Sequence, residues 1–489
     1  MISIDIGTQG TKAGLLDEKL RVISDFFEPS RLQHGNAGEI WQEPEDIYGS
    51  CIHVIKGLLE KSKISGSQVL AIGVDSQMAG IMGIDKEGEA STWYDSWLDT
   101  RCRKYIPLLE KEAALAARSG GPVTNSHAAK MLWWKYERPE AWNKTAVFVL
   151  PHGYVTGKMT GNKAEEAVFD YTCLHFNNFS DNAGKSWNED ALRQFDIEPD
   201  KMPRIVSPFE IVGTTTKEFA EQTGLVSGIP VAAGLGDSAA STFGSGMFEP
   251  GMLLDCAGTA SILCSVVDSY VPDLKNQTLV MMRSPIDGLW NPLSYIGGGG
   301  MCIRWFRDQL TGRQSLPYEQ LEKEAFAVPA GCDGLLFCPH FSGRVLPPRP
   351  NLKGAFVGLD FTHTRAHLYR SILEGIAYEY AIYLDSMREN YKGYKFEKMT
   401  VVGGGAQSSL FNRIKADTLN VSVMTCEMGE TALTGSAAVA GMAIGLIRDY
   451  RKVIQNTVKE KTLFGPEKRN REIYDYKIRQ YRNMLERLA

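Results

Sequence analysis

Residues 1–17 read MISIDIGTQGTKAGLLD: an apolar strand, a turn of small polar residues and a returning strand. Ile2, Ile4 and Ile6 alternate along the first strand, as in a strand with one buried face. The turn, residues 7–11, contains two glycines and two threonines. Glycine lets the backbone approach a ligand closely, and clustered N–H groups bind phosphate oxygens. The pattern is compatible with a phosphate-binding hairpin. A single turn of this kind is more often a hairpin with no ligand.

The same arrangement returns about half a chain later. Residues 252–256 form an apolar strand, residues 257–260 (AGTA) a turn, and residues 261–267 a returning strand. Two such units predict two related α/β halves, each presenting one turn to a ligand. A third glycine turn, residues 403–405, follows another apolar strand. With three such turns in one chain, nucleotide binding and a purely structural role as hairpins become equally good explanations.

Several other segments of the sequence are predicted to be helices. Residues 44–62 read as a helix with a proline in its first turn, and residues 104–117 read as another. The uncharged run 431–447 is short for a membrane span and rich in Ala and Gly, so we expect a closely packed interior helix. We expect an N-terminal domain at 1–246, a C-terminal domain at 247–447 and a helical tail at 448–489. The tail has apolar residues at 4-3-4-3 spacing and is expected to pack on the N-terminal domain.

Composition narrows the class of protein. The chain has 489 residues, of which 43% are hydrophobic and 23% charged, as is usual for a soluble globular enzyme. Nine cysteines without a C-x-x-C pair indicate reduced thiols, and no leader-like segment opens the sequence, so we expect a cytoplasmic protein. A net charge of −5 argues against nucleic acid as the main partner. Residues 448–489 hold 12 Lys and Arg against 6 Asp and Glu, which we interpret as a solvated helix face rather than a nucleic-acid or membrane contact.

Several common catalytic motifs are missing. Gly297–Gly300 is followed by Met301 and Cys302, so it is not a P-loop, which requires Lys and Ser or Thr there. The start of a dinucleotide turn at 244–246 lacks its third glycine. Thr364 stands where a zinc-dependent H-E-x-x-H motif requires glutamate. If the glycine turns bind a nucleotide, they do so without a P-loop or a dinucleotide-binding turn.

Two carboxylates follow apolar strands at positions suited to chemistry. Asp5 ends the first strand beside the glycine turn, where it could hold Mg²⁺ directly or through water, or simply cap the turn. Asp237 ends a buried strand and begins a small-residue stretch. It could accept a proton from a substrate hydroxyl or only cap a helix, and spacing alone does not separate these roles.

Taken together, the motifs resemble the FGGY family of carbohydrate kinases over nearly the whole chain. The matching segments are DIGTQGTKAGLLD (5–17), GLGDSAAS (234–241), LDCAGTAS (254–261), GAFVGLDFTHTRAHLYRSILE (354–374) and GGGAQSSLFNRIKAD (403–417). The N-terminal family signature is only partly met, since Asn125 and His127 depart from it while 130–133 fits its core.

The resemblance implies a fold, a reaction and a set of site residues. It implies two actin-like ATPase (ribonuclease H-like) α/β domains facing across a deep cleft, ATP and Mg²⁺ as cofactors, and transfer of the γ-phosphoryl group to a sugar hydroxyl, with Asp237 as general base and Asp5 serving the metal. Family members are often dimers. The implied nucleotide-binding residues are Gly7, Thr8, Gln9, Thr11 and Lys12 in the first half, and Gly258, Thr259, Gly300, Gly404, Gly405 and Ser409 in the second.

The sugar is less sharply indicated. Segments 77–80 and 97–101 are most similar to the xylulokinase group, so the resemblance places Gln77, Met78, Asp99 and Arg101 at the substrate, with Asp237. The structural alternatives are core packing for Met78 and a surface ion pair for Asp99 and Arg101. Ala79 and Ser238 replace a His and an Asn of that group, which changes the recognition of hydroxyls. A ketopentose such as xylulose is expected. Another ketose such as ribulose, a deoxy sugar, a polyol such as erythritol, a linear signalling sugar or a non-catalytic nucleotide-gated module remain alternatives.

Overall fold

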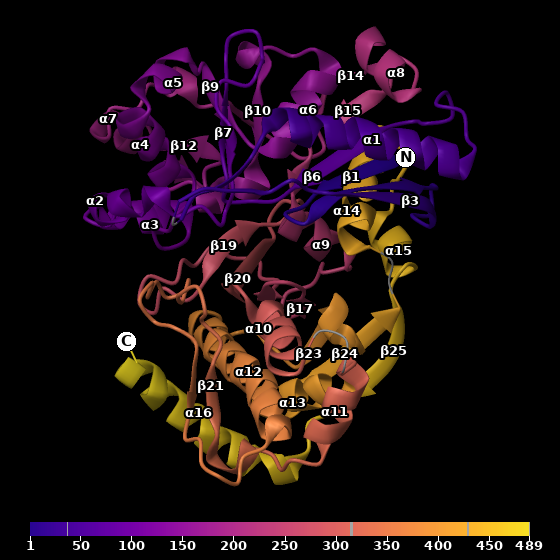
Figure 1. Cartoon of the computed structure of the whole chain (residues 1–489). Helices are drawn as coiled ribbons and strands as arrows, with labels where there is room; N and C mark the ends of the chain where they lie inside the picture. The colour runs from indigo at the N-terminus through magenta and orange to yellow at the C-terminus, as the bar shows by residue number, and fades with distance from the viewer. Residues whose placement is uncertain (37, 313–315, 428–429, 489) are drawn as a thin grey trace. The chain divides into compact units, whose positions relative to one another are not determined.

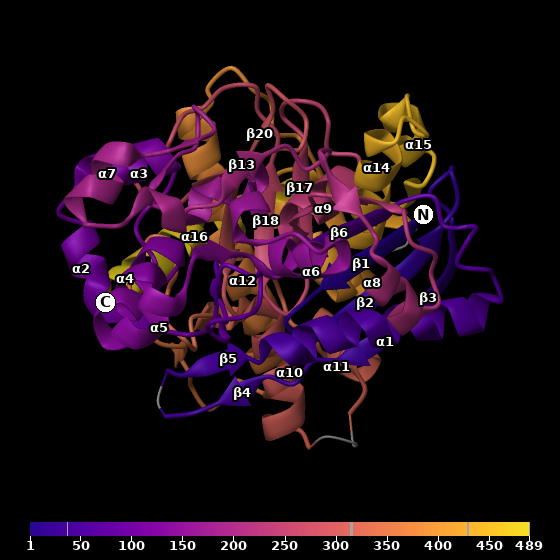
Figure 2. The ribbon, with the colours of Figure 1, turned by 90° about the horizontal axis from the view of Figure 1, so that it is seen from above.

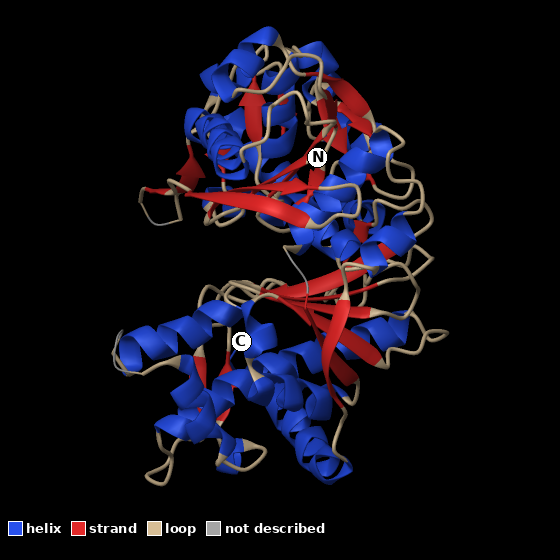
Figure 3. Cartoon of the chain, turned by 90° about the vertical axis from the view of Figure 1, so that its right-hand side faces the viewer, coloured by secondary structure: helices blue, strands red, loops and turns tan. Residues whose placement is uncertain are grey.

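The computed structural model describes residues 1–36, 38–312, 316–427 and 430–488. These residues form two compact α/β units, each assembled from three stretches of the chain. The first unit comprises Met1–Gly246, Met281–Trp290 and Met428–Val458, and the second comprises Met247–Val280, Asn291–Glu427 and Lys459–Ala489. In each unit a sheet is covered by helices (Figure 3).

The first unit is built on a seven-stranded sheet with the order β14-β15-β6-β1-β2-β3, and β16 also pairs with β6. The strands are β1 (Ile2–Ile6), β2 (Gly10–Leu16), β3 (Val22–Pro29), β6 (Ile72–Ser76), β14 (Ile211–Thr214), β15 (Pro230–Ala232) and β16 (Leu235–Gly236). β1 is antiparallel to β2 and parallel to β6, which places Asp5 opposite Lys12 on one side and Asp75 on the other. The carboxyl ends of β1, β6 and β16 therefore lie together.

Helices and smaller sheets surround this sheet. The helices are α1 (Pro44–Ser62), α2 (Ile106–Leu109), α3 (Ala113–Ser119), α4 (His127–Glu137), α5 (Pro139–Lys144), α6 (Pro151–Thr160), α7 (Glu189–Gln194), α8 (Lys217–Thr223), α9 (Asp237–Gly244), α14 (Thr431–Ala443) and α15 (Tyr450–Gln455). The smaller strands are β4 (Gln33–His34), β5 (Ile40–Gln42), β7 (Met82–Ile84), β8 (Tyr94–Asp95), β9 (Val147–Val149), β10 (Val168–Asp170), β11 (Ser180–Asp181), β12 (Ser186–Trp187) and β13 (Arg204–Val206). The predicted helix at 44–62 is confirmed: α1 starts at a proline and lies along β2 and β3 (Figure 2).

The helix α14 lies in the first unit, so the prediction that 247–447 forms one continuous domain is wrong. Figure 1 shows α14 among the N-terminal elements of this unit, although it is late in the sequence. Small residues explain the placement: a Cβ on Gly435 would lie 2.1 Å from Ala240 O, and one on Gly73 would lie 2.2 Å from Ser436 O. Glycines therefore allow α14 to approach β6 and α9 at backbone distance. No helix among the described residues combines the length and apolar character needed to cross a membrane.

The second unit has a sheet of the same design, with the order β19-β20-β18-β17-β23-β24-β25. Its strands are β17 (Leu253–Ala257), β18 (Ser261–Ser265), β20 (Trp290–Ile296), β23 (Lys398–Val402), β24 (Ser422–Glu427) and β25 (Lys459–Phe464), with β21 (Leu336–Cys338) and β22 (Ala355–Val357) paired separately. Of β19 (Val280–Arg283), which pairs at the edge of this sheet, residues 281–283 are counted with the first unit. Its helices are α10 (Gly299–Trp305), α11 (Tyr318–Phe326), α12 (Arg365–Asn390), α13 (Ser409–Leu419) and α16 (Lys468–Leu488). β17 is antiparallel to β18 and parallel to β23, just as β1 is antiparallel to β2 and parallel to β6.

The terminal helix α16 packs on α12 and α13 of the second unit, so the prediction that the tail packs on the N-terminal domain is wrong for this helix, whereas residues 448–458, with α15, belong to the first unit. Tyr474 donates to Glu374 Oε1 at 3.2 Å, and Tyr481 donates to Glu379 Oε2 at 2.8 Å. Both glutamates belong to α12 and are buried. The apolar face of the terminal helix is a packing surface, as predicted. Its partner is α12 of the second unit, which these two tyrosine–glutamate hydrogen bonds join to α16.

Candidate functional site

The first glycine turn joins β1 to β2 as a tight hairpin. Gly7 N donates to Gly10 O at 3.0 Å. A Cβ on Gly10 would lie 2.4 Å from Glu28 O, so β3 leaves no room for a side chain there. Glycine at this position follows from the close approach of β3.

The threonine hydroxyls of this turn are engaged within the protein. Thr8 Oγ1 donates to Gln77 Oε1 at 3.2 Å and accepts from Trp97 Nε1 at 2.8 Å. Thr11 Oγ1 lies 2.7 Å from Ser50 Oγ. The turn predicted to hold phosphate is thus tied directly to Gln77, a residue predicted to hold the sugar.

Two further residues of the first phosphate motif lie near the surface. Gln9 is exposed, and its carbonyl accepts from Ser30 N at 3.0 Å. Lys12 Nζ lies 2.7 Å from a Glu430 carboxylate oxygen and 3.3 Å from one of Asp25. The positive charge of Lys12, which was expected beside the phosphates, is therefore paired with the carboxylates of Asp25 and Glu430.

Three carboxyl groups belong to the adjoining ends of β1, β6 and the start of α9. Burial raises the pKa of Asp5 to about 6, and the charge of Glu430 contributes to the rise. Burial and the charge of Asp5 hold the pKa of Asp75 well above its usual range. Asp75 accepts a hydrogen bond from the Ser436 hydroxyl through Oδ2, whereas its buried Oδ1 has no partner in the described structure. Asp75 was not predicted as a site residue, although the sequence shows a carboxylate near the end of an apolar strand there, as it does at Asp5.

Asp237 is the first residue of α9. Its Oδ1 accepts from Ser238 N at 2.6 Å, which orients the carboxylate at the helix N-terminus. Burial raises the pKa of Asp237 to about 7, and the charge of Asp5 adds to the effect. A carboxylate with this pKa is matched to proton transfer near neutral pH.

Two of the predicted substrate residues adjoin these carboxyl groups. Gln77 N donates to Ile6 O at 2.9 Å, and Gln77 Nε2 donates to Gln42 Oε1 at 2.5 Å. The Met78 side chain covers Gly236, where an added Cβ would lie 2.4 Å from Met78 Cε. The first unit therefore brings Gln77 and Met78 beside the turn and Asp237.

The other predicted substrate pair is built into a buried network. Arg101 Nε donates to Asp99 Oδ2 at 2.8 Å, and Arg101 Nη2 donates to Asp95 Oδ1 at 2.7 Å. The guanidinium group lies 4.4 Å from the ring centre of Trp133 and 5.2 Å from that of Trp93. Asp99 and Arg101 are thus bonded to each other and packed against two tryptophans, so the pair is not an exposed ion pair, and its role at the sugar stays a prediction.

The three glycine segments of the second unit converge. A Cβ on Gly300 would lie 1.9 Å from Gly258 O, and Met301 N donates to Thr259 O at 3.2 Å. A Cβ on Gly405 would lie 2.5 Å from Ala257 Cβ. The predicted phosphate turn after β17, the start of α10 and the predicted adenosine turn after β23 therefore share one surface.

This surface continues to the start of α13. Gly404 and Ser409 are exposed there. The helix is capped by Ser408 Oγ, which accepts from Phe411 N at 3.1 Å, and by Glu322 Oε1, which accepts from Leu410 N at 2.6 Å. Glu322 belongs to α11, and no sequence motif pointed to it. The exposed glycines and the start of the capped helix therefore follow directly on the turn after β23, which contacts the turn after β17.

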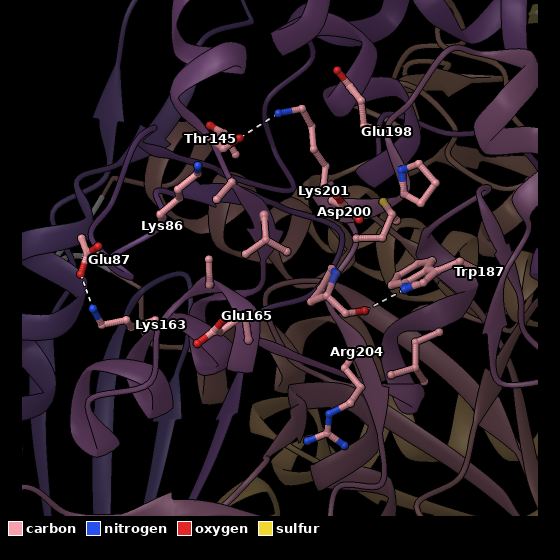
Figure 4. A pocket seen from close by; sticks show the side chains of 18 of the residues that line it. Lys86, Glu87, Thr145, Lys163, Glu165, Trp187, Glu198, Asp200, Lys201 and Arg204 are labelled. Atoms are coloured by element: carbon pink, nitrogen blue, oxygen red, sulfur yellow. Dashed lines mark hydrogen bonds and ion pairs between the residues drawn. The ribbon is translucent and has the colours of Figure 1, made fainter.

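A large hollow in the first unit does not coincide with these residues. It has a volume of about 1120 Å³, and none of the predicted site residues lines it. Figure 4 shows two of its lysines engaged within the chain: Lys163 pairs with Glu87, and Lys201 donates to Thr145 O. Arg204 pairs with Glu210. Much of the positive charge that lines the hollow is therefore compensated within the chain.

Comparison with known proteins assigns the family. Residues 1–244 match the model of the N-terminal domain of the FGGY family of carbohydrate kinases, and residues 282–444 match the model of its C-terminal domain. The chain belongs to the FGGY family of carbohydrate kinases. The family and the actin-like two-domain α/β fold predicted from the motifs are confirmed.

Individual relatives of the chain act on different substrates. A xylulose kinase of Bacillus subtilis is 27% identical over 496 residues, covering 99% of this chain and 96% of that protein. A gluconokinase of the same species is 26% identical over 467 residues, covering 93% and 89%. The ligand-bound crystal structure of a Lactobacillus acidophilus xylulose kinase superposes with a TM-score of 0.91 at 21% identity, covering 100% of this chain and 98% of that one. These similarities support a carbohydrate kinase without fixing its sugar.

Proposed function

We propose that the chain transfers the γ-phosphoryl group of ATP to a hydroxyl of a small sugar, with a ketopentose such as xylulose as the leading candidate. The observation that carries this proposal is Asp237, a carboxylate with a pKa of about 7 at the start of α9, beside Gln77 and Met78. A base with that pKa can accept the proton of an attacking hydroxyl at neutral pH.

The other residues would position and neutralise the phosphates. Phosphoryl transfer needs little more than in-line placement and charge compensation. We assign nucleotide binding to Gly7, Thr8, Gln9, Thr11 and Lys12 in the first unit and to Gly258, Thr259, Gly300, Gly404, Gly405 and Ser409 in the second. The three converging turns of the second unit support this assignment, whereas the internal partners of Thr8 and Lys12 would have to rearrange for those side chains to reach phosphate.

The carboxyl groups beside the first turn fit a magnesium ion. Asp5 is partly exposed, and Asp75 Oδ1 is buried without a partner in the described structure. Carboxylate oxygens are the ligands Mg²⁺ prefers, and one or two suffice because the ion keeps several waters. A magnesium ion held there would supply positive charge that offsets the charge of the phosphates. Among the described residues there is no cluster of three or more His, Cys, Asp or Glu side chains that could hold a metal ion.

A substrate panel tests the proposed function. Purified protein with ATP and Mg²⁺ is incubated with ketopentoses, tetritols, glycerol, gluconate and deoxy sugars, and ADP release is measured directly by chromatography. We expect one sugar to raise ADP release at least about a hundredfold above the sugar-free rate, because a site built around specific hydroxyls rejects analogues strongly. ATP binding with no stimulation by any sugar would instead favour a nucleotide-gated binding module.

The pKa of Asp237 predicts the pH dependence of turnover. Its proton must leave before it can act as base, so kcat/KM should fall about tenfold per pH unit below about pH 7 and level off above it. The measurement is kcat/KM for the preferred sugar from pH 5 to 9, in overlapping buffers at constant ionic strength. A profile that stays flat down to pH 5 would exclude Asp237 as a base with this pKa.

A further inference from the structure

A buried hydrogen-bonded chain crosses the first unit close to Asp237. His152, in the first turn of α6, has Nδ1 2.7 Å from Ser76 Oγ at the end of β6. Its Nε2 lies 2.9 Å from Asp170 Oδ2 at the end of β10. All three residues are at most 1% exposed. The imidazole therefore joins two strand ends inside the protein.

The order of groups in this chain, hydroxyl, imidazole and carboxylate, is that of a hydrolase triad. A nucleophilic serine must reach its substrate. Ser76 is 0% exposed, and its hydroxyl also lies 3.3 Å from Gln77 O, an alternative acceptor. The arrangement is suited to holding backbone segments together and not to attacking a substrate.

The chain continues from Asp170 to the residue before Asp237. Asp170 Oδ1 accepts from Thr172 N at 2.8 Å and also from the Thr172 hydroxyl. Thr172 Oγ1 in turn accepts from Gly236 N at 3.1 Å. A polar path thus links the imidazole of His152 to the backbone N–H of Gly236, the residue before Asp237.

The same backbone segment is fixed from a second side. Gly236 pairs with Ser76 in the parallel register of β16 and β6. Gly234 has φ +89°, and a Cβ there would lie 2.4 Å from Val74 O and 3.2 Å from His152 Cδ2. The residues leading into Asp237 are therefore held between β6 on one side and the His152–Thr172 path on the other.

We propose that His152 and Thr172 are positioning residues that fix the backbone carrying Asp237, an inference that rests on the proposed role of Asp237 as base. A general base must lie within hydrogen-bond reach of the proton it removes, and a displacement of about 1 Å can cost a hundredfold in rate. Asp170 fixes the orientation of the imidazole, and Thr172 transmits that orientation to Gly236.

The decisive comparison is Thr172→Val against Thr172→Ser. The valine has nearly the same shape but cannot accept from Gly236 N, whereas serine keeps the hydroxyl. We expect Thr172→Val to lower kcat for the preferred sugar by about tenfold to a hundredfold with KM for ATP nearly unchanged, and Thr172→Ser to restore most of it. His152→Gln is the second variant and should lower kcat in the same way.

A control variant and a hydrogen-exchange measurement keep this test independent of folding and of the proposed function. Thr223→Val removes a buried hydroxyl that donates to Phe219 O and accepts from Leu225 N, at the end of α8, and should leave kcat unchanged. Hydrogen exchange of residues 233–239, followed by mass spectrometry, should speed up in Thr172→Val and in His152→Gln but not in Thr223→Val. If no sugar is turned over, the proposed function fails while the exchange rates still judge the positioning role. Wild-type exchange in Thr172→Val would overturn the inference, as would wild-type kcat.

Discussion

Replacing Asp237 with Asn should lower sugar-dependent ADP release about a thousandfold at pH 8 while leaving ATP binding nearly intact. Asparagine keeps the size of the side chain and an oxygen that can accept from Ser238 N, so the start of α9 should not move. It cannot accept a proton from the sugar, and loss of a general base typically costs 10²–10⁴-fold. The measurements are kcat by direct ADP detection and ATP affinity by calorimetry.

The same substitution should make the protein more stable at pH 8. The pKa of Asp237 lies above that of an exposed aspartate, so its stabilising contribution is present in acid and is lost as pH rises from about 4 to 7. Removing the buried charge should raise the melting temperature by a few degrees at pH 8 and not at pH 4. Asp190→Asn, at an exposed carboxylate of α7, is the matched control for both effects. Activity retained in Asp237→Asn would remove the base from the proposal.

The elements that position the candidate site were predictable because their signals are local. The hairpins at β1–β2 and β17–β18 show the alternation and the glycine turns directly in the sequence. The helix α1 begins where Pro44 permits it. By contrast, the helix predicted at 104–117 is divided into α2 and α3, with a proline in the first turn of α2 and an interruption before Ala113. Periodicity alone did not register that break.

What the sequence could not supply are contacts between distant segments. The Asp75–Ser436 contact joins residues 361 positions apart, and it belongs to the packing that puts α14 on the first unit. Small residues in α14 are compatible with either sheet, so the pattern alone could not choose one. The Asp99–Arg101 pair resembled a surface feature because its tryptophan neighbours come from separate segments. The His152 path likewise needs four separate segments, each unremarkable by itself.

The second large effect is expected in the second unit, where Lys415 and Asp255 form a fully buried ion pair. Lys415 Nζ lies 2.6 Å from Asp255 Oδ2, and both side chains are 0% exposed. Tyr380 donates to the other carboxylate oxygen at 2.7 Å. Asp255 is in β17, which leads into the predicted phosphate turn, and Lys415 is in α13, which follows the predicted adenosine turn. The pair therefore connects, inside the second unit, the strand before the predicted phosphate turn and the helix after the predicted adenosine turn.

Lys415→Met should destabilise the second unit by about 3–5 kcal/mol, because it leaves the charge of Asp255 buried without a partner. The measurement is urea unfolding followed by a probe of the second unit, with ATP affinity in parallel. Adding Asp255→Asn should recover most of the loss, since the amide carries no charge and still offers Tyr380 an acceptor. Lys398→Met breaks only an exposed pair with Glu460 and should cost no more than about 1 kcal/mol. A loss in Lys415→Met no larger than in this control, or no recovery in the double variant, would show that the buried pair does not stabilise the nucleotide elements.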